Sequence, residues 1–296
     1  MEIKFRKPEL EDRALVERYF RMDQTRSCEY TFANLYLWSR QYPVEFAVVG
    51  DMVVFRYTQE QHFLFPRGDR ADLRRTIDAL LQWCEEREVP FHLTVVTKEQ
   101  FALLDELYPG KFTIEYYRDA ADYVYETEKL ISLSGKKYHG KKNHLNKFQR
   151  LYQDWNYEPV GPDNVEECFR MAQDWRRSNG CEEDPEKNAE MCVTLNALRL
   201  HSELGLCGGL IRTGGRVVAF SIGEPVSDDT MVVHIEKAYA DVQGAYTIMN
   251  QQFLAHEAAQ YRYVNREDDA GDEGLRRAKE SYHPVFMVEK GIVSLQ

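Results

Sequence analysis

Residues 44–57 read VEFAVVGDMVVFRY, two apolar runs that meet at Gly50-Asp51. A glycine–aspartate pair between two such runs is typical of a tight turn, so the runs are expected to pair as antiparallel strands. Residues 206–224, LCGGLIRTGGRVVAFSIGE, repeat the arrangement with the turn at Gly214-Gly215. These hairpins exclude a single doubly wound parallel sheet, because that fold needs a helix after every strand.

The elements around the two hairpins follow one order in both halves of the chain. Before the first hairpin we expect a strand at 2–6 and helices at 8–22 and 30–40. After it we expect strands at 62–66, 91–96, 112–117 and 121–126, with helices at 72–87 and 98–108 between them. In the second half we expect helices at 164–178 and 186–205 before the hairpin. After it we expect a strand at 230–239, a helix at 245–260, a strand at 261–265, a helix at 273–282 and a closing strand at 286–293. The sequence therefore predicts an α+β protein of two tandem domains, 1–130 and 131–296, each a mostly antiparallel mixed sheet flanked by helices. This order resembles the fold of the GCN5-related N-acetyltransferases.

Composition excludes several classes of protein. The chain has 296 residues, a formal net charge of −11 and 43% apolar residues, which is typical of a globular protein. The N-terminus has no apolar signal segment and no run of eighteen apolar residues occurs, so neither a signal peptide nor a transmembrane segment is expected and the predicted location is cytoplasmic. The six cysteines show no CxxC spacing, so we expect free thiols and no metal site. The acidic balance disfavours nonspecific duplex binding, so any contact with nucleic acid must be local.

A basic segment stands out against that acidic background. Residues 134–150, SGKKYHGKKNHLNKFQR, hold five lysines, two histidines and one arginine without a carboxylate. If Ser134 caps a helix, Lys141 projects between Leu145 and Phe148 on the apolar stripe, where a solvated charged face does not place a cation. A solvated face stays an alternative, but we favour an anion site, with phosphate as the first ligand. Its expected residues are Lys136, Lys137, Lys141, Lys142 and His144.

Three stretches together resemble one large bacterial family. They are LSGKKYHGKKNHLNKF (133–148), HIEKAYADVQGAYTIMNQQF (234–253) and YVNREDDAGDEGLRRAKESYHP (263–284). They are similar to the C-terminal catalytic domain of the phosphatidylglycerol lysyltransferases over essentially the whole chain. The resemblance implies transfer of an aminoacyl group from charged tRNA to an amine or hydroxyl. The chain lacks those enzymes' multi-span membrane domain, which leaves the acceptor open between a small molecule and a lipid headgroup.

The strand TMVVHIEKAY, residues 230–239, carries the first candidate catalytic residues. Alternation along a strand puts His234 and Glu236 on one face, side by side. In acyltransferases of the resembling fold this strand faces the acyl donor and often supplies the base, for which Glu236 is the first choice. The alternative is a cross-strand salt bridge with a satisfied histidine. After the strand, Gly244 and Ala245 start a helix whose free N–H groups suit a single phosphate or carboxylate, although Asp241 stands where coenzyme A users carry Arg or Gln. A plain turn is the alternative there.

The second concentrated segment follows the strand that ends near residue 264. Acidic and polar side chains there are placed to hold a cationic acceptor or donor amine, or else form a solvated loop. The expected substrate-binding residues are Asn265, Arg266, Glu267, Asp268, Asp269, Arg276 and Lys279. Several acetyltransferases of the resembling fold use a tyrosine in this region to protonate the leaving group, which makes Tyr282 the candidate general acid, against a packing role.

We therefore expect the second domain to hold the active site, with the basic helix bridging the two domains. The first domain is expected to be degenerate, because its strand 62–66 and the following PRGDRADL offer no base and no phosphate loop beyond Arg67, Gly68 and Arg70. The expected co-substrate is aminoacyl-tRNA first and a coenzyme A thioester second, with no covalently bound cofactor. The alternative is a noncatalytic ligand-binding protein that kept the fold. The oligomeric state is left open by the sequence.

Overall fold

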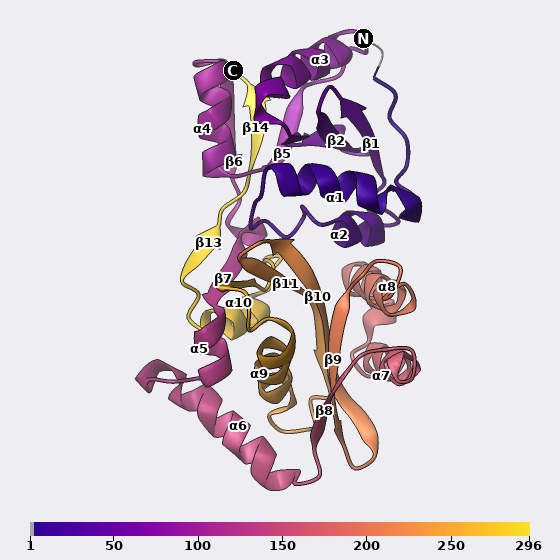
Figure 1. Cartoon of the computed structure of the whole chain (residues 1–296), viewed down its shortest axis with the longest axis vertical. Helices are drawn as coiled ribbons and strands as arrows, with labels where there is room; N and C mark the ends of the chain where they lie inside the picture. The colour runs from indigo at the N-terminus through magenta and orange to yellow at the C-terminus, as the bar shows by residue number, and fades with distance from the viewer. Residues whose placement is uncertain (1–2) are drawn as a thin grey trace. The chain divides into compact units, whose positions relative to one another are not determined.

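The computed structural model describes residues 3–296. The chain forms two compact units, each interrupted in sequence (Figure 1). Unit 1 consists of residues 1–122, 268–271 and 287–296, and unit 2 of residues 123–267 and 272–286. The boundaries differ from the predicted 1–130 and 131–296: residues 123–130 join unit 2, and the last ten residues return to unit 1. None of the described helices is both long and apolar enough to cross a membrane.

The sheet of unit 1 has the strand order β1-β2-β3-β5-β14-β6, with β4 paired to β2. The predicted hairpin forms β1 (Val44–Val49) and β2 (Met52–Tyr57), followed by β3 (His62–Leu64) and β4 (Arg67–Gly68). The other strands are β5 (His92–Val96), β6 (Phe112–Tyr116) and β14 (Gly291–Leu295). β3 and β5 run parallel, and the other pairings in this sheet are antiparallel.

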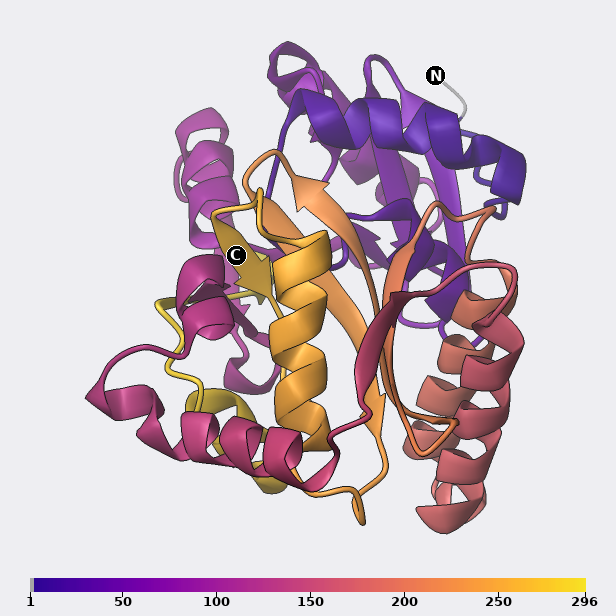
Figure 2. The same cartoon turned by 60° about the horizontal axis from the view of Figure 1, so that its bottom comes forward.

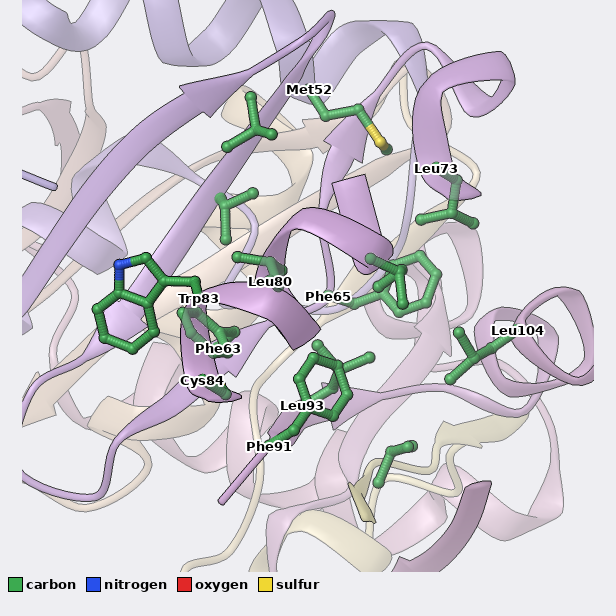
Figure 3. Close-up of a cluster of buried hydrophobic side chains, with 14 of the residues drawn as sticks. Met52, Phe63, Phe65, Leu73, Leu80, Trp83, Cys84, Phe91, Leu93 and Leu104 are labelled. Atoms are coloured by element: carbon green, nitrogen blue, oxygen red, sulfur yellow. The ribbon is translucent and has the colours of Figure 1, made fainter. Parts of the chain in front are cut away.

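Helices cover both faces of this sheet because residues alternate sides along each strand. On one face α1 (Arg13–Met22) packs Phe20 against Phe55 of β2, and α2 (Phe32–Trp38) packs against α1. On the other face α3 (Leu73–Glu85) and α4 (Lys98–Leu107) contribute Leu80 and Leu104 to the main apolar core. Figure 3 shows this core around Phe63 and Leu93 of the parallel strand pair.

The second sheet has the order β13-β7-β12-β11-β10-β9-β8. Its strands are β7 (Asp122–Glu126), β8 (Asn156–Pro159), β9 (Cys207–Thr213), β10 (Arg216–Ser227), β11 (Thr230–Ala238), β12 (Tyr263–Asn265) and β13 (Phe286–Val288). The predicted second hairpin is β9 and β10, and β10 also pairs antiparallel with β11. β11 and β12 run parallel, as β3 and β5 do in the other sheet. The predicted fold class, two mixed α+β domains in tandem, is confirmed.

The helices of unit 2 lie on opposite faces of that sheet (Figure 2). They are α5 (Thr127–Ser132), α6 (His139–Leu151), α7 (Val165–Ser178), α8 (Pro185–Arg199), α9 (Ala245–Glu257) and α10 (Glu273–Glu280). Asn250 of α9 reaches Glu236 of β11, whereas Glu190 of α8 reaches Lys237, the next residue along the strand. Consecutive residues of a strand point to opposite faces, so α9 covers the face that carries Glu236.

Several predicted elements differ at their ends. The strand expected at 2–6 is reduced to one bridge between Arg6 and Phe46, and its Glu2 lies outside the described residues. The helix expected from residue 8 begins with a short 3-10 turn, so α1 itself starts at Arg13. The basic helix starts at His139 rather than beside Ser134, because Gly135 has φ of 98° and a 3-10 turn follows it.

The closing strand predicted at 286–293 is two strands in two different sheets. β13 ends at Val288 and pairs at the edge of the second sheet, and β14 starts at Gly291 between β5 and β6. The intervening Lys290 is buried and its Nζ donates to Asp122 Oδ1 at 2.6 Å, which anchors the chain where it changes sheets. Hydrophobic periodicity does not reveal this break, because both strands are apolar and only three residues apart.

Candidate functional site

The site residues on β11 lie beyond the end of its parallel neighbour. The last paired residues are Val232 of β11 and Asn265 of β12, where β12 ends. β11 continues past this point with His234 and Glu236, and a register shift between β10 and β11 leaves His234 between the paired residues Val233 and Ile235, so the expected alternation is interrupted there. In open sheets the carboxyl ends of parallel strands commonly hold the ligand, and the residues that follow β12 start at this same place.

Glu236 is held from two elements. Its Oε1 accepts a hydrogen bond from Arg266 Nη2 at 3.1 Å, and its Oε2 accepts one from Asn250 Nδ2 at 3.3 Å. The side chains of Glu236 and Arg266 are each only 12% exposed. Ser221 of β10 stands directly opposite Glu236 in the strand register and shares its face.

Three polar atoms around this carboxylate are buried without a hydrogen-bond partner among residues 3–296. They are Arg266 Nη1, which is a donor, Asn250 Oδ1, which is an acceptor, and Ser221 Oγ, which is both. Buried polar groups are nearly always paired, so a group of orphans beside an ion pair indicates a place where a ligand or water supplies the partners. The arrangement offers both a donor and an acceptor to such a ligand.

Lys141 and Tyr282 extend this cluster. The Nζ of Lys141 lies 3.8 Å from the centroid of the Tyr282 ring, and the Arg266 guanidinium lies 5.0 Å from the same centroid. Burial and, to a smaller extent, the Arg266 charge lower the pKa of Lys141 to about 8, and the Glu236 charge opposes this change. Burial raises the pKa of Tyr282, so its hydroxyl is protonated at neutral pH. Lys141, Glu236, Arg266 and Tyr282, four of the predicted site residues, thus lie close together.

His234 is locked between two carboxylates. Its Nδ1 lies 2.7 Å from Glu267 Oε1 and its Nε2 lies 3.1 Å from Glu224 Oε1. Burial alone would lower the pKa of His234, but the hydrogen bonds and charges of the two carboxylates outweigh it and raise that pKa to about 10. The ring is therefore an imidazolium that donates from both nitrogens at neutral pH. It has no lone pair with which to act as a base, which favours the alternative that His234 is a fully hydrogen-bonded member of a salt bridge.

The other charged residues of the basic segment are exposed. Lys136, Lys137, Lys142 and His144 point to solvent, and Lys141 alone of the five predicted anion-binding residues is half-buried. The exposed cations remain available to a large anionic ligand, since none of them makes an ion pair with another residue in the range 3–296 that the structure describes.

Gly244 has a packing role at the start of α9. Its φ is +85°, and a Cβ there would come within 2.7 Å of the His144 carbonyl oxygen and 2.9 Å of Phe148 Cβ, both on α6. Ala245, the first residue of α9, is buried. The glycine therefore permits a left-handed turn and a close approach of α6. This packing explains why residue 244 is a glycine, and no bound phosphate is needed to explain it.

The residues predicted to bind substrate after β12 divide into three groups. Asn265 and Lys279 support the backbone of the site: Asn265 Oδ1 accepts from Glu267 N at 2.6 Å, and Lys279 Nζ donates to the Arg266 carbonyl at 2.6 Å. The Arg266 side chain contacts Glu236 and the Glu267 side chain contacts His234, and Glu267 adopts φ of 58°, a strained value for a residue other than glycine. Arg276 of α10 is half-buried.

Asp268 and Asp269 belong to unit 1 and are engaged there. Asp269 is fully buried, lies 3.3 Å from Arg118 and accepts from Gly271 N, while Asp268 accepts from Ala270 N. Of the acidic residues expected to hold a cationic amine, Glu267 instead contacts His234, and the two aspartates that follow it belong to unit 1.

Sequence reasoning missed Ser221, Glu224 and Asn250. Each interrupts an apolar stretch: Ser221 and Glu224 lie in the strand VVAFSIGE, and Asn250 lies in the helix AYTIMNQQF. A polar residue at a buried position is the signal that was available, because such residues need partners. For metal binding, ligand atoms gather among residues 3–296 at Cys28, Glu29 and Asp122 of unit 1, where the Lys290 ammonium already donates to both carboxylates.

Two mixed sheets, each with one parallel strand pair, define a tandem protein of the GCN5-related N-acetyltransferase fold. A solved tandem protein of that class, from the clavulanic acid biosynthesis pathway, superimposes with a TM-score of 0.50 at 6% identity over 99% of this chain and 98% of its own. The chain belongs to the family described as phosphatidylglycerol lysyltransferase, C-terminal, whose model matches residues 20–292.

Two further solved structures and one sequence relative are similar to this chain. A conserved protein of unknown function from Bacteroides thetaiotaomicron is 34% identical, with a TM-score of 0.95 over 100% of both chains. L-PGS from Bacillus licheniformis is 13% identical, with a TM-score of 0.66 over 97% of this chain and 92% of its own, and so shares the fold. An uncharacterised protein of Mycoplasmoides gallisepticum is 22% identical over 190 residues, 63% of this chain and 60% of that relative's length. The family relation supports a transferase in general.

Proposed function

We propose that the protein transfers an aminoacyl group from aminoacyl-tRNA to an amine or hydroxyl acceptor. The observation that carries the proposal is the buried cluster around Glu236, in which Asn250 Oδ1 offers an acceptor and Arg266 Nη1 offers a donor with no partner in the described chain. Family membership supports a transferase, and the description of the family names lysyl transfer.

The cluster suits an aminoacyl group better than a simple acyl group. An aminoacyl ester carries an ammonium on the carbon next to its carbonyl. Asn250 Oδ1 is placed to accept a hydrogen bond from that ammonium, and Arg266 Nη1 is placed to donate one to the carbonyl oxygen. An acetyl group would satisfy the donor and leave the amide oxygen of Asn250 unpaired, at a cost of about 1–3 kcal/mol.

The reaction then uses the groups already gathered at the cluster. The acceptor amine or hydroxyl attacks the ester carbonyl and passes its proton to Glu236, while Arg266 stabilises the negative charge that develops on the carbonyl oxygen. The bond between the carbonyl carbon and the ribose oxygen breaks, and that oxygen takes a proton from the buried hydroxyl of Tyr282. His234 stays protonated and positions Glu267 and Glu224.

The donor is held by local contacts to phosphate. The exposed Lys136, Lys137 and Lys142 supply these contacts on a chain whose net charge is −11. Coenzyme A is the second choice of donor, because α6 covers the start of α9 at Gly244, where coenzyme A users of this fold would need open backbone N–H groups for the pyrophosphate.

The chemical test is Glu236→Gln, which keeps the shape and loses the base. After a panel of amines and hydroxyl compounds with charged tRNAs and acetyl-coenzyme A has identified a turnover, we expect the rate to fall by about 10² to 10⁴ with little change in donor affinity. Glu190→Gln is the matched control, because Glu190 pairs with Lys237 on the opposite face of the same strand. If turnover persists in both Glu236→Gln and His234→Gln, the active site does not lie on β11.

The donor test is the salt dependence of tRNA binding. Replacing Lys136, Lys137, Lys141 and Lys142 with alanine should flatten the slope of log K against log salt by roughly 0.7 to 0.9 for each phosphate that the variant no longer neutralises. A variant with Lys98→Ala, an exposed lysine of unit 1, should keep the parent slope. An unchanged slope in the fourfold variant would contradict the tRNA assignment, and binding without any turnover would favour the noncatalytic alternative.

A further inference from the structure

Unit 1 has a polar cluster at the same topological place as the site in unit 2. Its parallel pair, β3 and β5, has Leu64 and Thr94 as its last partners, as Val232 and Asn265 are in the other sheet. Arg67 follows three residues after Leu64, within β4. Ligands commonly bind at the carboxyl ends of parallel strands in an open sheet, so the polar groups at this place in unit 1 are candidates for a second ligand site.

Arg67 presents an unused fork of two donors. Its side chain is 3% exposed, and its Nη1 lies 3.0 Å from Asp23 Oδ2. Its Nε and Nη2 are buried with no hydrogen-bond partner within residues 3–296. These two nitrogens carry parallel N–H bonds on one edge of the guanidinium, the geometry that grips both oxygens of a carboxylate.

Gln100 adds a third donor near Tyr30. Its Oε1 accepts from Thr97 N at 2.8 Å at the start of α4, and its buried Nε2 has no partner in the described chain. Tyr30 is the shared neighbour: the Arg67 guanidinium lies 4.9 Å from its ring centroid. Burial raises the pKa of Tyr30, while the Arg67 charge and the Gln100 side chain act to lower it.

The local charge and backbone agree with an anionic ligand. Asp23 is shared by Arg67 at 3.0 Å and Arg70 at 2.7 Å, so these three groups carry one net positive charge. Lys290 is paired with both Glu29 and Asp122, so that separate group carries one net negative charge. Val95, one residue beyond the last parallel pair on β5, adopts φ of 58°, a strained value for a β-branched residue and one that is typical of functional sites.

We propose that unit 1 binds a small molecule through a carboxylate group, which the Arg67 fork grips from one edge and Gln100 contacts with a third hydrogen bond. One carboxylate group would balance the net positive charge that Arg67, Arg70 and Asp23 carry among themselves. This goes beyond the transfer proposed for unit 2 and is independent of it. The first domain, which lacks a base, is on this view a binding domain.

The test follows the Arg67 Nε–H resonance in proton–nitrogen spectra of the full chain during titration with acetate, with chloride at matched ionic strength. The resonance is assigned from Arg67→Lys, or from sequential assignment if that variant does not fold. We expect a saturable shift with acetate and none with chloride. Gln100→Glu keeps an oxygen for the Thr97 cap but offers the fork an internal carboxylate, so it should weaken acetate binding by at least about tenfold. Gln59→Glu, the same change at an exposed turn, should bind as the parent does.

Three results would overturn the proposal. The first is an Arg67 Nε–H that exchanges with a bound water and does not respond to acetate. The second is Gln100→Glu binding acetate as tightly as Gln59→Glu does. The third is a response to inorganic phosphate alone, which would exclude the carboxylate. Glu236→Gln should leave the acetate titration unchanged, so failure of the transfer proposal and failure of this one are separable.

Discussion

Because of His234, the free energy of unfolding of the protein is expected to fall as the pH rises into the alkaline range. Its pKa lies near 6.5 in an unfolded chain and is raised to about 10 in the folded one. The proton is therefore bound more tightly in the folded state, and the stabilisation it provides is complete below pH 6.5 and lost as pH rises through 10. At about 1.36 kcal/mol per pKa unit, the rise amounts to at most about 5 kcal/mol.

The assay is urea unfolding of the parent and of His234→Gln at a series of pH values from 6.5 to 10.5. The difference in unfolding free energy between the two proteins isolates the histidine, because other titrating groups contribute to both curves. Lys141 is one such group: burial lowers its pKa to about 8, so it acts in the opposite direction over part of this range. We expect the difference to be largest at pH 6.5 and to shrink by several kcal/mol toward pH 10.5.

His256→Gln is the matched control, because that imidazole is exposed and stacks on Tyr157 instead of lying between carboxylates. It should follow the parent curve at every pH. A difference between parent and His234→Gln that stays constant from pH 6.5 to 10.5 would refute the reasoning, since it would mean that His234 gains no proton affinity on folding. If His234→Gln does not fold, a carbon-13 titration of the His234 ring in the parent measures the same pKa directly.

Two further substitutions test packing and a buried ion pair. Gly244→Ala should destabilise the protein by about 2 kcal/mol in urea unfolding, because φ there is +85° and the new methyl would lie 2.9 Å from Phe148 Cβ; an unchanged midpoint would contradict the close approach of α6. Lys290→Met should cost about 3–5 kcal/mol, since it removes the buried ammonium that contacts both Asp122 and Glu29, and the loss should shrink at low pH as the carboxylates are protonated. Lys98→Met breaks an exposed pair and should cost less than about 1 kcal/mol, so equal losses from the two lysines would argue against the burial.

Much of the candidate site follows from local pattern. Helical spacing placed Lys141 on the apolar side of the basic segment, where it is half-buried. Alternation along residues 230–239 predicted that His234 and Glu236 share a face, and the bulge at His234 interrupts that alternation. Both predictions are short-range statements about where a side chain points on a regular element. The charge of His234 could not be read in the same way, because Glu224 and Glu267, which set it, come from other parts of the chain.

The sequence by itself determined the two hairpins, the order of the elements in each half and therefore the tandem α+β architecture, since turn chemistry and periodicity act within a few residues. Only the tertiary structure decided that residues 291–295 cross into the first sheet between β5 and β6, and that Asp268 and Asp269 belong to unit 1. A strand pairs wherever an open edge presents free N–H and C=O groups, and which edge is open depends on the packing of the whole domain. The pairing of Glu236 with Arg266 and the unused fork of Arg67 are decided in the same way, because a buried charge takes the partners that the folded chain brings within reach.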